Sequence, residues 1–372
     1  MYKNVLLGLA LSLTVVIFGS CRSHKELSVT YVPEEQGITF EKITDELTDD
    51  VRHPSIYRED GIIYWAQLNT IALSPDNKSV AFISSKNDRS NIFVKSSEAR
   101  GTSMQRSYNS EVNSISYSPD GESICYSEEG VDGYRSIKII NAKQGSMVQQ
   151  ISPNYVYDNN PKYSPNGKRI FFERLEGSNY SIWSYNFETS SFSSHCYGNC
   201  PIPINDEEFL CTRKNAKGYW EIWRINFVKG NESVIASLSD RSFTSPSVSP
   251  DGNWMVCVST TKPSKRLFVQ RNLDLYIMRM DGLSTPSQLT FYRGTDYQPV
   301  WSPDGKYIYF MSQRGSRNGR AYNIWKMNTP SNVNVSENNN TVQKQVPNNN
   351  NATQKQVPNS NGGPSKLPKK IK

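Results

Sequence analysis

The chain lacks the residues and motifs on which many hydrolases and metalloenzymes depend. It has 3 histidines in 372 residues, which leaves little room for a histidine-rich metal site. It has no His-Glu-x-x-His motif of a zinc protease. It also has no Gly-x-Ser-x-Gly nucleophile elbow, because the nearest approximation, residues 282–286, ends in proline. These absences exclude the common zinc-protease and α/β-hydrolase sites.

Long hydrophobic runs are also lacking, apart from one at the N-terminus. The run from Val5 to Phe18 follows Lys3 and is too short to cross a bilayer comfortably, but it suits the core of a signal peptide over residues 1–20. It ends in Gly19-Ser20-Cys21, which resembles the lipobox of bacterial lipoproteins, although Phe18 stands where that family most often has leucine. The resemblance implies that Cys21 is acylated and that residues 21–37 are a tether. The alternative is an ordinary secretory signal with a coincidental cysteine.

Acidic residues are missing directly after Cys21, where the chain reads Arg22-Ser23-His24-Lys25. Lipoprotein families that are exported to the cell surface often carry acidic residues there. We therefore expect an outer-membrane lipid anchor that faces the periplasm, and surface exposure stays open as the alternative.

Cysteines are few, and each has a simple interpretation. Cys125, Cys211 and Cys257 lie inside apolar strand patterns and are expected to be small core residues. Cys196 and Cys200 flank a short Tyr-Gly-Asn loop and could form a disulfide in an oxidising compartment. Their spacing without histidine partners does not indicate zinc, so no metal site is predicted.

The informative feature that is present is an internal repeat. Aromatic residues reach 11%, with 21 tyrosines, which favours β structure. A Ser-Pro-Asp-Gly turn motif, or a close variant, recurs roughly every 44 residues and precedes an alternating apolar run. The copies begin at Ser74, Ser118, Ser164, Ser249 and Ser302, and residues 204–207 are a degenerate copy.

The motif has the chemistry of a tight hairpin. Proline presets φ near −65°, aspartate or asparagine bonds its own backbone, and glycine or asparagine accepts a positive φ. A third strand follows each hairpin, and a fourth is clearest at residues 287–290. The third strands are expected at 91–94, 136–139, 181–184, 221–224, 275–278 and 323–326. Four short antiparallel strands make one propeller blade, so six copies predict an all-β, six-bladed β-propeller.

The repeat resembles that of TolB-type (WD40-like) propellers. The resemblance is carried by Leu289-Thr290, by residues 299–306 (Pro-Val-Trp-Ser-Pro-Asp-Gly-Lys) and by Ile324-Trp325-Lys326-Met327. It covers residues 38–328 and is specific for fold but not for function, since similar propellers occur in TolB, in oligopeptidase gating domains and in envelope lipoproteins. TolB has an α/β domain ahead of its propeller, and the short segment between Cys21 and Ile38 leaves no room for one.

The ends of the propeller can also be predicted. The sixth blade lacks a fourth strand, and residues 38–44 resemble the missing one, so we expect them to pair with it and close the ring. Residues 54–65 are a half-repeat that could form an extra hairpin. The segment 329–372 is rich in Asn, Lys and Pro and contains no aromatic residue, so it is predicted to be disordered.

Other propeller enzymes do not fit the sequence. No stretch of the size of a hydrolase domain follows the propeller in this sequence, so an oligopeptidase is not expected. Propeller lyases that act on pectic fragments bind metal through several histidines, whereas only His53 and His195 lie in this propeller. Sialidase boxes carry a spacer residue that Ser-Pro-Asp-Gly lacks. The repeated aspartates are therefore interpreted as turn residues, and no catalytic residue or cofactor is predicted.

Strand order places the loops on two rims. The loops between second and third strands share one rim with the connections between blades, and we call this the connector rim. The Ser-Pro-Asp-Gly turns share the other, the turn rim. The connector rim is expected to be basic on one side, where ten cations are opposed only by Asp274; they are Arg213, Lys214, Lys217, Lys262, Lys265, Arg266, Arg271, Arg314, Arg317 and Arg320.

The opposite side of the connector rim is expected to be acidic. Glu128, Glu129 and Asp132 stand against Arg135, and Glu173 and Glu176 against Arg174. Four tyrosines on the connections, Tyr155, Tyr157, Tyr292 and Tyr297, are candidate anchors for a partner. The plainer alternatives are that exposed loops are simply charged and that these tyrosines pack between blades.

The sequence thus favours a non-enzymatic envelope lipoprotein whose propeller docks another envelope protein or lipoprotein in a cell-envelope or secretion assembly. The alternatives are binding of a glycan or peptidoglycan fragment, and an unrecognised propeller lyase or hydrolase. Nucleic acid is not an expected partner of an exported chain. The net charge of +7 does not indicate a basic, nucleic-acid-binding propeller. The signal segment carries +1 and the residues after Asn328 carry +5, so only +1 is left for residues 21–328.

Overall fold

The structure, a computed structural model, describes residues 35–52, 56–59, 62–65, 67–86, 89–99, 101–260, 273–282, 284–317, 321–333 and 335. The expected signal peptide, the acylation of Cys21 and nearly all of the expected tether and disordered tail lie outside these residues.

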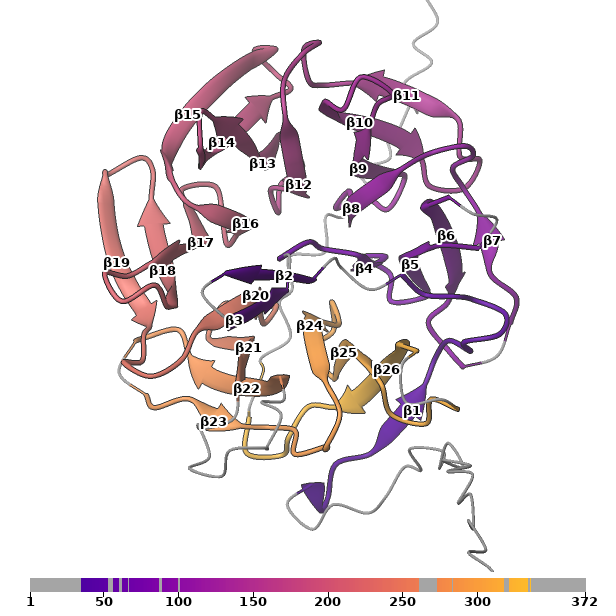
Figure 1. Ribbon diagram of the computed structural model, residues 1–372, viewed down its shortest axis with the longest axis vertical. Coiled ribbons are helices and arrows are strands. Elements are labelled where there is room, and N and C mark those ends of the chain that lie inside the picture. The colour runs from indigo at the N-terminus through magenta and orange to yellow at the C-terminus, as the bar shows by residue number, and fades with distance from the viewer. Residues whose placement is uncertain are drawn as a thin grey trace, which may run out of the picture. The chain divides into compact units, whose positions relative to one another are not determined.

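The described chain forms six four-stranded antiparallel sheets arranged in a ring, with β4, β8, β12, β16, β20 and β24 as the inner strands (Figure 1). This confirms the predicted six-bladed all-β propeller. Blades one to three are β4 (Ile71–Leu73), β5 (Ser79–Ser84), β6 (Asn91–Ser96), β7 (Met104–Gln105); β8 (Val112–Tyr117), β9 (Ser123–Glu129), β10 (Arg135–Asn141), β11 (Met147–Gln150); and β12 (Asp158–Tyr163), β13 (Arg169–Glu176), β14 (Asn179–Asn186), β15 (Ser191–Tyr197).

Blades four to six follow the same plan. They are β16 (Asn199–Pro203), β17 (Glu208–Lys214), β18 (Trp220–Asn226), β19 (Asn231–Ala236); β20 (Phe243–Val248), β21 (Trp254–Thr260), β22 (Leu273–Arg279), β23 (Ser287–Gln288); and β24 (Asp296–Trp301), β25 (Tyr307–Ser312), β26 (Asn323–Asn328) with β1 (Phe40–Lys42). The described residues contain no helix long and apolar enough to span a bilayer.

The ring is closed by the N-terminal strand, as predicted. β1 pairs antiparallel with β26, with Phe40 opposite Met327. Thr39 extends the pairing, because its backbone N–H donates to the Asn328 side chain at 2.6 Å. Closure joins the two ends of the propeller, and β1 covers the edge that β26 would otherwise expose.

The half-repeat ahead of blade one forms a separate hairpin. Strands β2 (Ile56–Glu59) and β3 (Ile62–Trp65) pair only with each other and join none of the six four-stranded sheets. This segment is therefore an extra hairpin and not part of a seventh blade.

The repeated turn residues do what turn chemistry predicts. In each complete copy the serine hydroxyl donates to the Asp or Asn side chain two residues later, at 2.6 Å in blade two (Ser118 to Asp120) and 2.8 Å in blade three (Ser164 to Asn166). The same carboxylate oxygen of Asp120 accepts the Glu122 backbone N–H at 2.9 Å. Equivalent bonds lower the pKa of Asp76, where the Ser74 hydroxyl is the largest cause. These aspartates hold the turns together.

The core lies between neighbouring blades. Flat apolar faces of successive sheets pack together in clusters, for example Phe171 and Ile182 of blade three against Phe209 of blade four. Cys125, Cys211 and Cys257 are fully buried in such layers, as expected.

The ordered chain continues beyond β26. The Thr329 backbone N–H donates to the Lys306 carbonyl at 2.8 Å, and its hydroxyl donates to the Gly305 carbonyl at 2.6 Å. Val333 is buried against the core of blade six. The expected boundary at Asn328 is therefore several residues too early, because this short segment packs on the turn rim.

Candidate interaction surface

A surface pocket of about 390 Å³ lies on the connector rim between blades two and three. It is lined by the loop between β9 and β10, the connection between β11 and β12, and the end of β13 with the loop that follows it. We call it the tyrosine pocket; its lining residues are Asp132, Gly133, Tyr134, Tyr155, Val156, Tyr157, Arg174, Leu175 and Gly177. Its position agrees with the prediction that these loops share one rim.

Two tyrosines from different segments meet at this pocket. The rings of Tyr134 and Tyr155 are 5.7 Å apart, centroid to centroid, and nearly perpendicular. Tyr155 is 74% exposed and Tyr134 is 43% exposed, and Val131 in the same loop is fully exposed. Exposed apolar side chains that gather at a concave site typically mark a binding surface.

The backbone at Tyr155 is strained. Its φ is +61°, a left-handed conformation that a bulky residue rarely adopts. Such strain costs on the order of 1–3 kcal/mol and is concentrated at functional sites. The chain keeps a large aromatic residue where glycine would fit the backbone better.

Cations and acids fix the floor of the pocket. The guanidinium of Arg135 lies 4.6 Å from the centre of the Tyr157 ring and pairs with Glu129 at 2.9 Å. Burial raises the pKa of the Tyr157 hydroxyl. Arg174 is held by two hydrogen bonds to the buried Asp158 carboxylate, at 2.7 and 2.8 Å. These contacts hold the floor in place beneath the exposed tyrosines.

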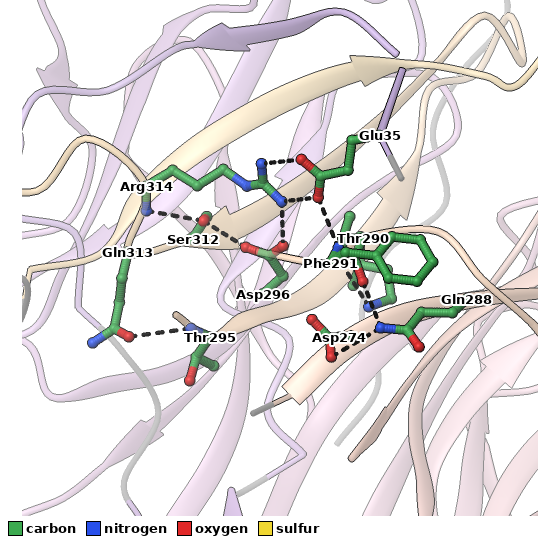
Figure 2. Close-up of polar contacts among 11 residues, drawn as sticks. Glu35, Asp274, Gln288, Thr290, Phe291, Thr295, Asp296, Ser312, Gln313 and Arg314 are labelled. Carbon is green, nitrogen blue, oxygen red and sulfur yellow. Dashed lines mark hydrogen bonds and ion pairs between the residues drawn. The ribbon is translucent and has the colours of Figure 1, made fainter. Parts of the chain in front are cut away.

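The expected basic side of the connector rim is not assembled as predicted, and Arg314 is the clearest correction. Arg314 is 2% exposed and lies inside the propeller, where it donates hydrogen bonds to Glu35 at 2.6 and 2.8 Å and to Asp296 at 2.8 Å (Figure 2). Its guanidinium also lies 4.3 Å from the Phe40 ring. Burial opposes its charge, but the two carboxylates outweigh burial and raise the pKa of Arg314.

Two of the four predicted tyrosine anchors are also buried. Tyr292 and Tyr297 are each 2% exposed. Tyr292 stacks on the Arg314 guanidinium at 4.7 Å, and Tyr297 packs edge-on against Tyr322 at 5.1 Å. They pack in the interior between strands, so neither can anchor a partner.

The other described cations of this side are scattered or already engaged. Arg213 donates to the Tyr197 carbonyl and pairs with Glu232, both within 2.9 Å. Lys214 lies over the Trp220 ring, Lys217 is exposed, and Arg317 lies 3.8 Å from Glu46. The remaining predicted members, Lys262, Lys265, Arg266, Arg271 and Arg320, lie outside the described residues.

Several acids assigned to the connector rim are likewise internal. Asp274 is 1% exposed, and burial together with the charge of Asp296 raises its pKa to about 8, so its carboxyl is largely protonated at neutral pH. Glu173 is buried and accepts a hydrogen bond from the Asn160 amide at 3.0 Å. Glu128 pairs with Lys138. Glu129, Asp132 and Glu176 of the predicted acidic side are exposed, and Asp132 lines the tyrosine pocket.

The suggested disulfide between Cys196 and Cys200 is not formed. Both are free thiols, and they face different surroundings. Cys196 packs into the layer between blades three and four, whereas Cys200 is buried beside Glu173 and Asn160. The two cysteines lie on strands of different blades, Cys196 on β15 of blade three and Cys200 on β16 of blade four.

Tyr134 was not predicted from the sequence, nor was the pattern of exposed aromatic residues between blades of which the tyrosine pocket is a part. Exposed aromatic residues occur where the chain passes from one blade to the next: Tyr108, Tyr155, Tyr197 and Phe291. The signal was available, because Tyr197 ends the fourth strand of its repeat and the other three follow theirs. Within the described part of the chain, no group of three or more His, Cys, Asp or Glu residues could hold a metal ion.

Comparison with known proteins agrees with this architecture. Residues 66–271 match the family model of the TolB beta propeller domain. No curated protein matches the chain significantly. A putative TolB from Agrobacterium tumefaciens is similar in structure with a TM-score of 0.52 and 18% identity, over 70% of this chain and 90% of its own.

Two further solved structures extend the comparison. TolB from Acinetobacter baumannii gives a TM-score of 0.51 at 20% identity, over 63% of this chain but only 56% of its own. An oligogalacturonate lyase from Vibrio parahaemolyticus gives 0.52 at 13% identity, over 80% of this chain and 98% of its own. These identities establish a shared fold only. The family model of the TolB beta propeller domain matches more than half of the residues of this chain, so the chain belongs to that family.

Proposed function

We propose that the protein is a non-enzymatic envelope lipoprotein whose propeller docks another envelope protein through the connector rim. The observation that carries this proposal is the tyrosine pocket, where Tyr134 and Tyr155 stay exposed and Tyr155 keeps a strained backbone. Tyrosine is enriched at the centres of protein interfaces, because it offers a large rigid surface with one polar tip.

The pocket suits a protein surface more than a buried small molecule. It is open to solvent, and its lining combines Asp132 and Arg174 with the tyrosines. The exposed aromatic residues of neighbouring connections, Tyr108 and Tyr197, extend the apolar surface along the same rim. A partner that covered these connections would bury several aromatic anchors at once.

Glycan binding is the second candidate, because sugar rings also stack on exposed tyrosines. The basic side that would attract an anionic polysaccharide is not collected on the described rim, since Arg314 is buried and Arg213 is paired. A lyase is the third candidate, in view of the oligogalacturonate lyase that shares this fold. No described carboxylate or histidine cluster supports it, and the repeat aspartates are engaged in turns.

Anchoring of the protein is proposed from the lipobox-like sequence at Cys21, which would place it on the periplasmic face of the outer membrane. Labelling with a radioactive fatty acid tests this: the wild-type chain should incorporate label and the Cys21→Ser variant should not.

Docking is tested by photo-crosslinking in the cell envelope. A photoreactive phenylalanine analogue replaces Tyr134, and in a matched control it replaces Lys143, an exposed residue of the same blade on the turn rim. A discrete protein adduct from position 134 but not from 143 supports the proposal. Adducts from neither position, together with binding of an oligosaccharide in calorimetry, would favour the glycan reading instead.

A further inference from the structure

We propose that Cys196 and Cys211 are a disulfide-forming pair that joins blade three to blade four. Cys196 lies on β15, the outer strand of blade three, and Cys211 on β17 of blade four. Both side chains belong to the apolar layer between these blades, where they pack with Phe171 and Phe209. The inference does not depend on the docking proposal.

The path of the chain holds the two sulfur atoms near each other. The connection after Cys196 passes closely over Cys211, since a Cβ placed on Gly198 would lie 3.1 Å from the Cys211 sulfur. Gly198 has a φ of +152°, so glycine allows both the backbone conformation and the close approach. Cys196 is two residues away and is thereby kept beside Cys211.

The other described cysteines are in different surroundings. Cys125 packs in the layer between blades two and three, and Cys257 in the layer between blades four and five. The Cys200 backbone is bound by Glu173, and its thiol lies beside Asn160 and Lys162. Among the described cysteines, Cys211 is therefore the partner that the packing offers to Cys196.

The two thiols also differ in exposure and in acidity, and both properties matter for thiol–disulfide exchange. Cys196 is half-buried, whereas Cys211 is fully buried. The neighbouring Cys211 thiol, aided by the Arg213 guanidinium, lowers the pKa of the Cys196 thiol and so favours its thiolate form. An accessible thiolate of this kind is the nucleophile in thiol–disulfide exchange.

The reaction needs an external disulfide, such as oxidised glutathione or the oxidised form of a dithiol exchange protein. The Cys196 thiolate attacks one sulfur of this disulfide, which forms a mixed disulfide and releases one thiolate. Cys211 then attacks the Cys196 sulfur, which forms the Cys196–Cys211 bond and releases the second thiolate, and this leaving thiolate takes up the Cys211 proton. Two protein thiols are oxidised and one external disulfide is reduced.

Peptide mapping of the full chain tests the pairing. Trypsin leaves residues 175–213 as one peptide containing all three cysteines, so a combined digest is needed that cuts after Tyr197 and Glu208. The protein is equilibrated with oxidised glutathione, trapped with iodoacetamide and digested without reductant. We expect a linked pair that contains Cys196 and Cys211, with Cys200 alkylated.

Variants separate this disulfide from the alternatives. Cys200→Ser should keep the linked pair, and Cys196→Ser should lose it. Oxidation should raise the Tm of the wild type and of Cys200→Ser by about 2–6 °C and leave Cys196→Ser unchanged. The proposal would be overturned if all three cysteines of the oxidised wild type were alkylated, or if a link to Cys200 formed. Both outcomes are measured on the wild-type protein, so they do not depend on whether a variant folds.

Discussion

Arg314 donates two hydrogen bonds to Glu35, which lies 279 positions earlier in the chain, at 2.6 and 2.8 Å (Figure 2). Asp296 accepts a further hydrogen bond from the same guanidinium, at 2.8 Å. The segment ahead of β1 is thus fastened to blade six by a buried ion pair as well as by strand pairing. A residue expected on the surface as a binding cation instead helps to close the ring.

Loss of this arginine should destabilise the propeller strongly. Arg314→Ala leaves the Glu35 and Asp296 carboxylates buried without a cation, which typically costs about 3–5 kcal/mol of the free energy of unfolding. Glu35→Ala should cost less, because Asp296 still pairs with Arg314. Urea denaturation gives both values, and Arg317→Ala, a change at an exposed side chain, should stay within about 0.5 kcal/mol of wild type. A similar loss in Arg317→Ala would argue against a specific role for Arg314.

Asp274 should make stability depend on pH. Its pKa is about 8 in the folded protein, against 3.8 for the unperturbed group. Burial is the largest cause. The negative charges of Asp296 and Glu35 raise the pKa further, and the positive charge of Arg314 offsets only part of this effect. Folding therefore requires a proton, so the contribution of Asp274 is fully favourable below pH 4 and is lost as the pH rises toward 8.

The Asp274→Asn variant tests this sign. Its free energy of unfolding should match wild type near pH 4 and exceed it by at least about 2 kcal/mol at pH 8. Asp281→Asn is the control, because Asp281 is partly exposed and pairs with Arg279. A stability difference that does not change with pH would contradict the assigned protonation of Asp274.

The repeated aspartates should behave as turn residues. Asp120→Ala removes two hydrogen bonds, from the Ser118 hydroxyl and the Glu122 N–H, and should cost about 1–2 kcal/mol. Asp120→Asn should be nearly neutral, because Asn166 makes the same two bonds in blade three. Equilibrium unfolding distinguishes the two. If Asn were as damaging as Ala, the charge of the aspartate would have a role beyond the turn.

Tyr155 should trade stability for binding. Tyr155→Gly relieves a positive φ and should leave the free energy of unfolding unchanged or raise it by up to about 1 kcal/mol, while it removes one wall of the tyrosine pocket. Tyr307→Ala, at an exposed ring beside Lys326 on blade six, controls for the general loss of a surface aromatic. A strongly destabilised Tyr155→Gly would mean that the tyrosine serves the fold.

The fold could be predicted because its information is local and repeated. Each turn, such as Ser118 to Gly121, encodes its own hairpin, and repetition fixes the number of blades. The interaction surface could not be predicted in the same way. Arg314 and Arg317 belong to the same loop sequence, and each meets a carboxylate from the segment ahead of blade one, yet only Arg314 turns inward and is buried. The partner of Cys196 depends on packing between blades and not on the short spacing to Cys200.

Docking through the connector rim is tested most directly by one crosslinking comparison. The photoreactive analogue at position 134 is irradiated in intact envelopes, in chains with and without Tyr155→Gly, after urea denaturation has established that both are folded. We expect a discrete protein adduct whose yield falls at least about tenfold with Tyr155→Gly. An adduct of equal yield in both chains would contradict the assignment of the tyrosine pocket as the docking site.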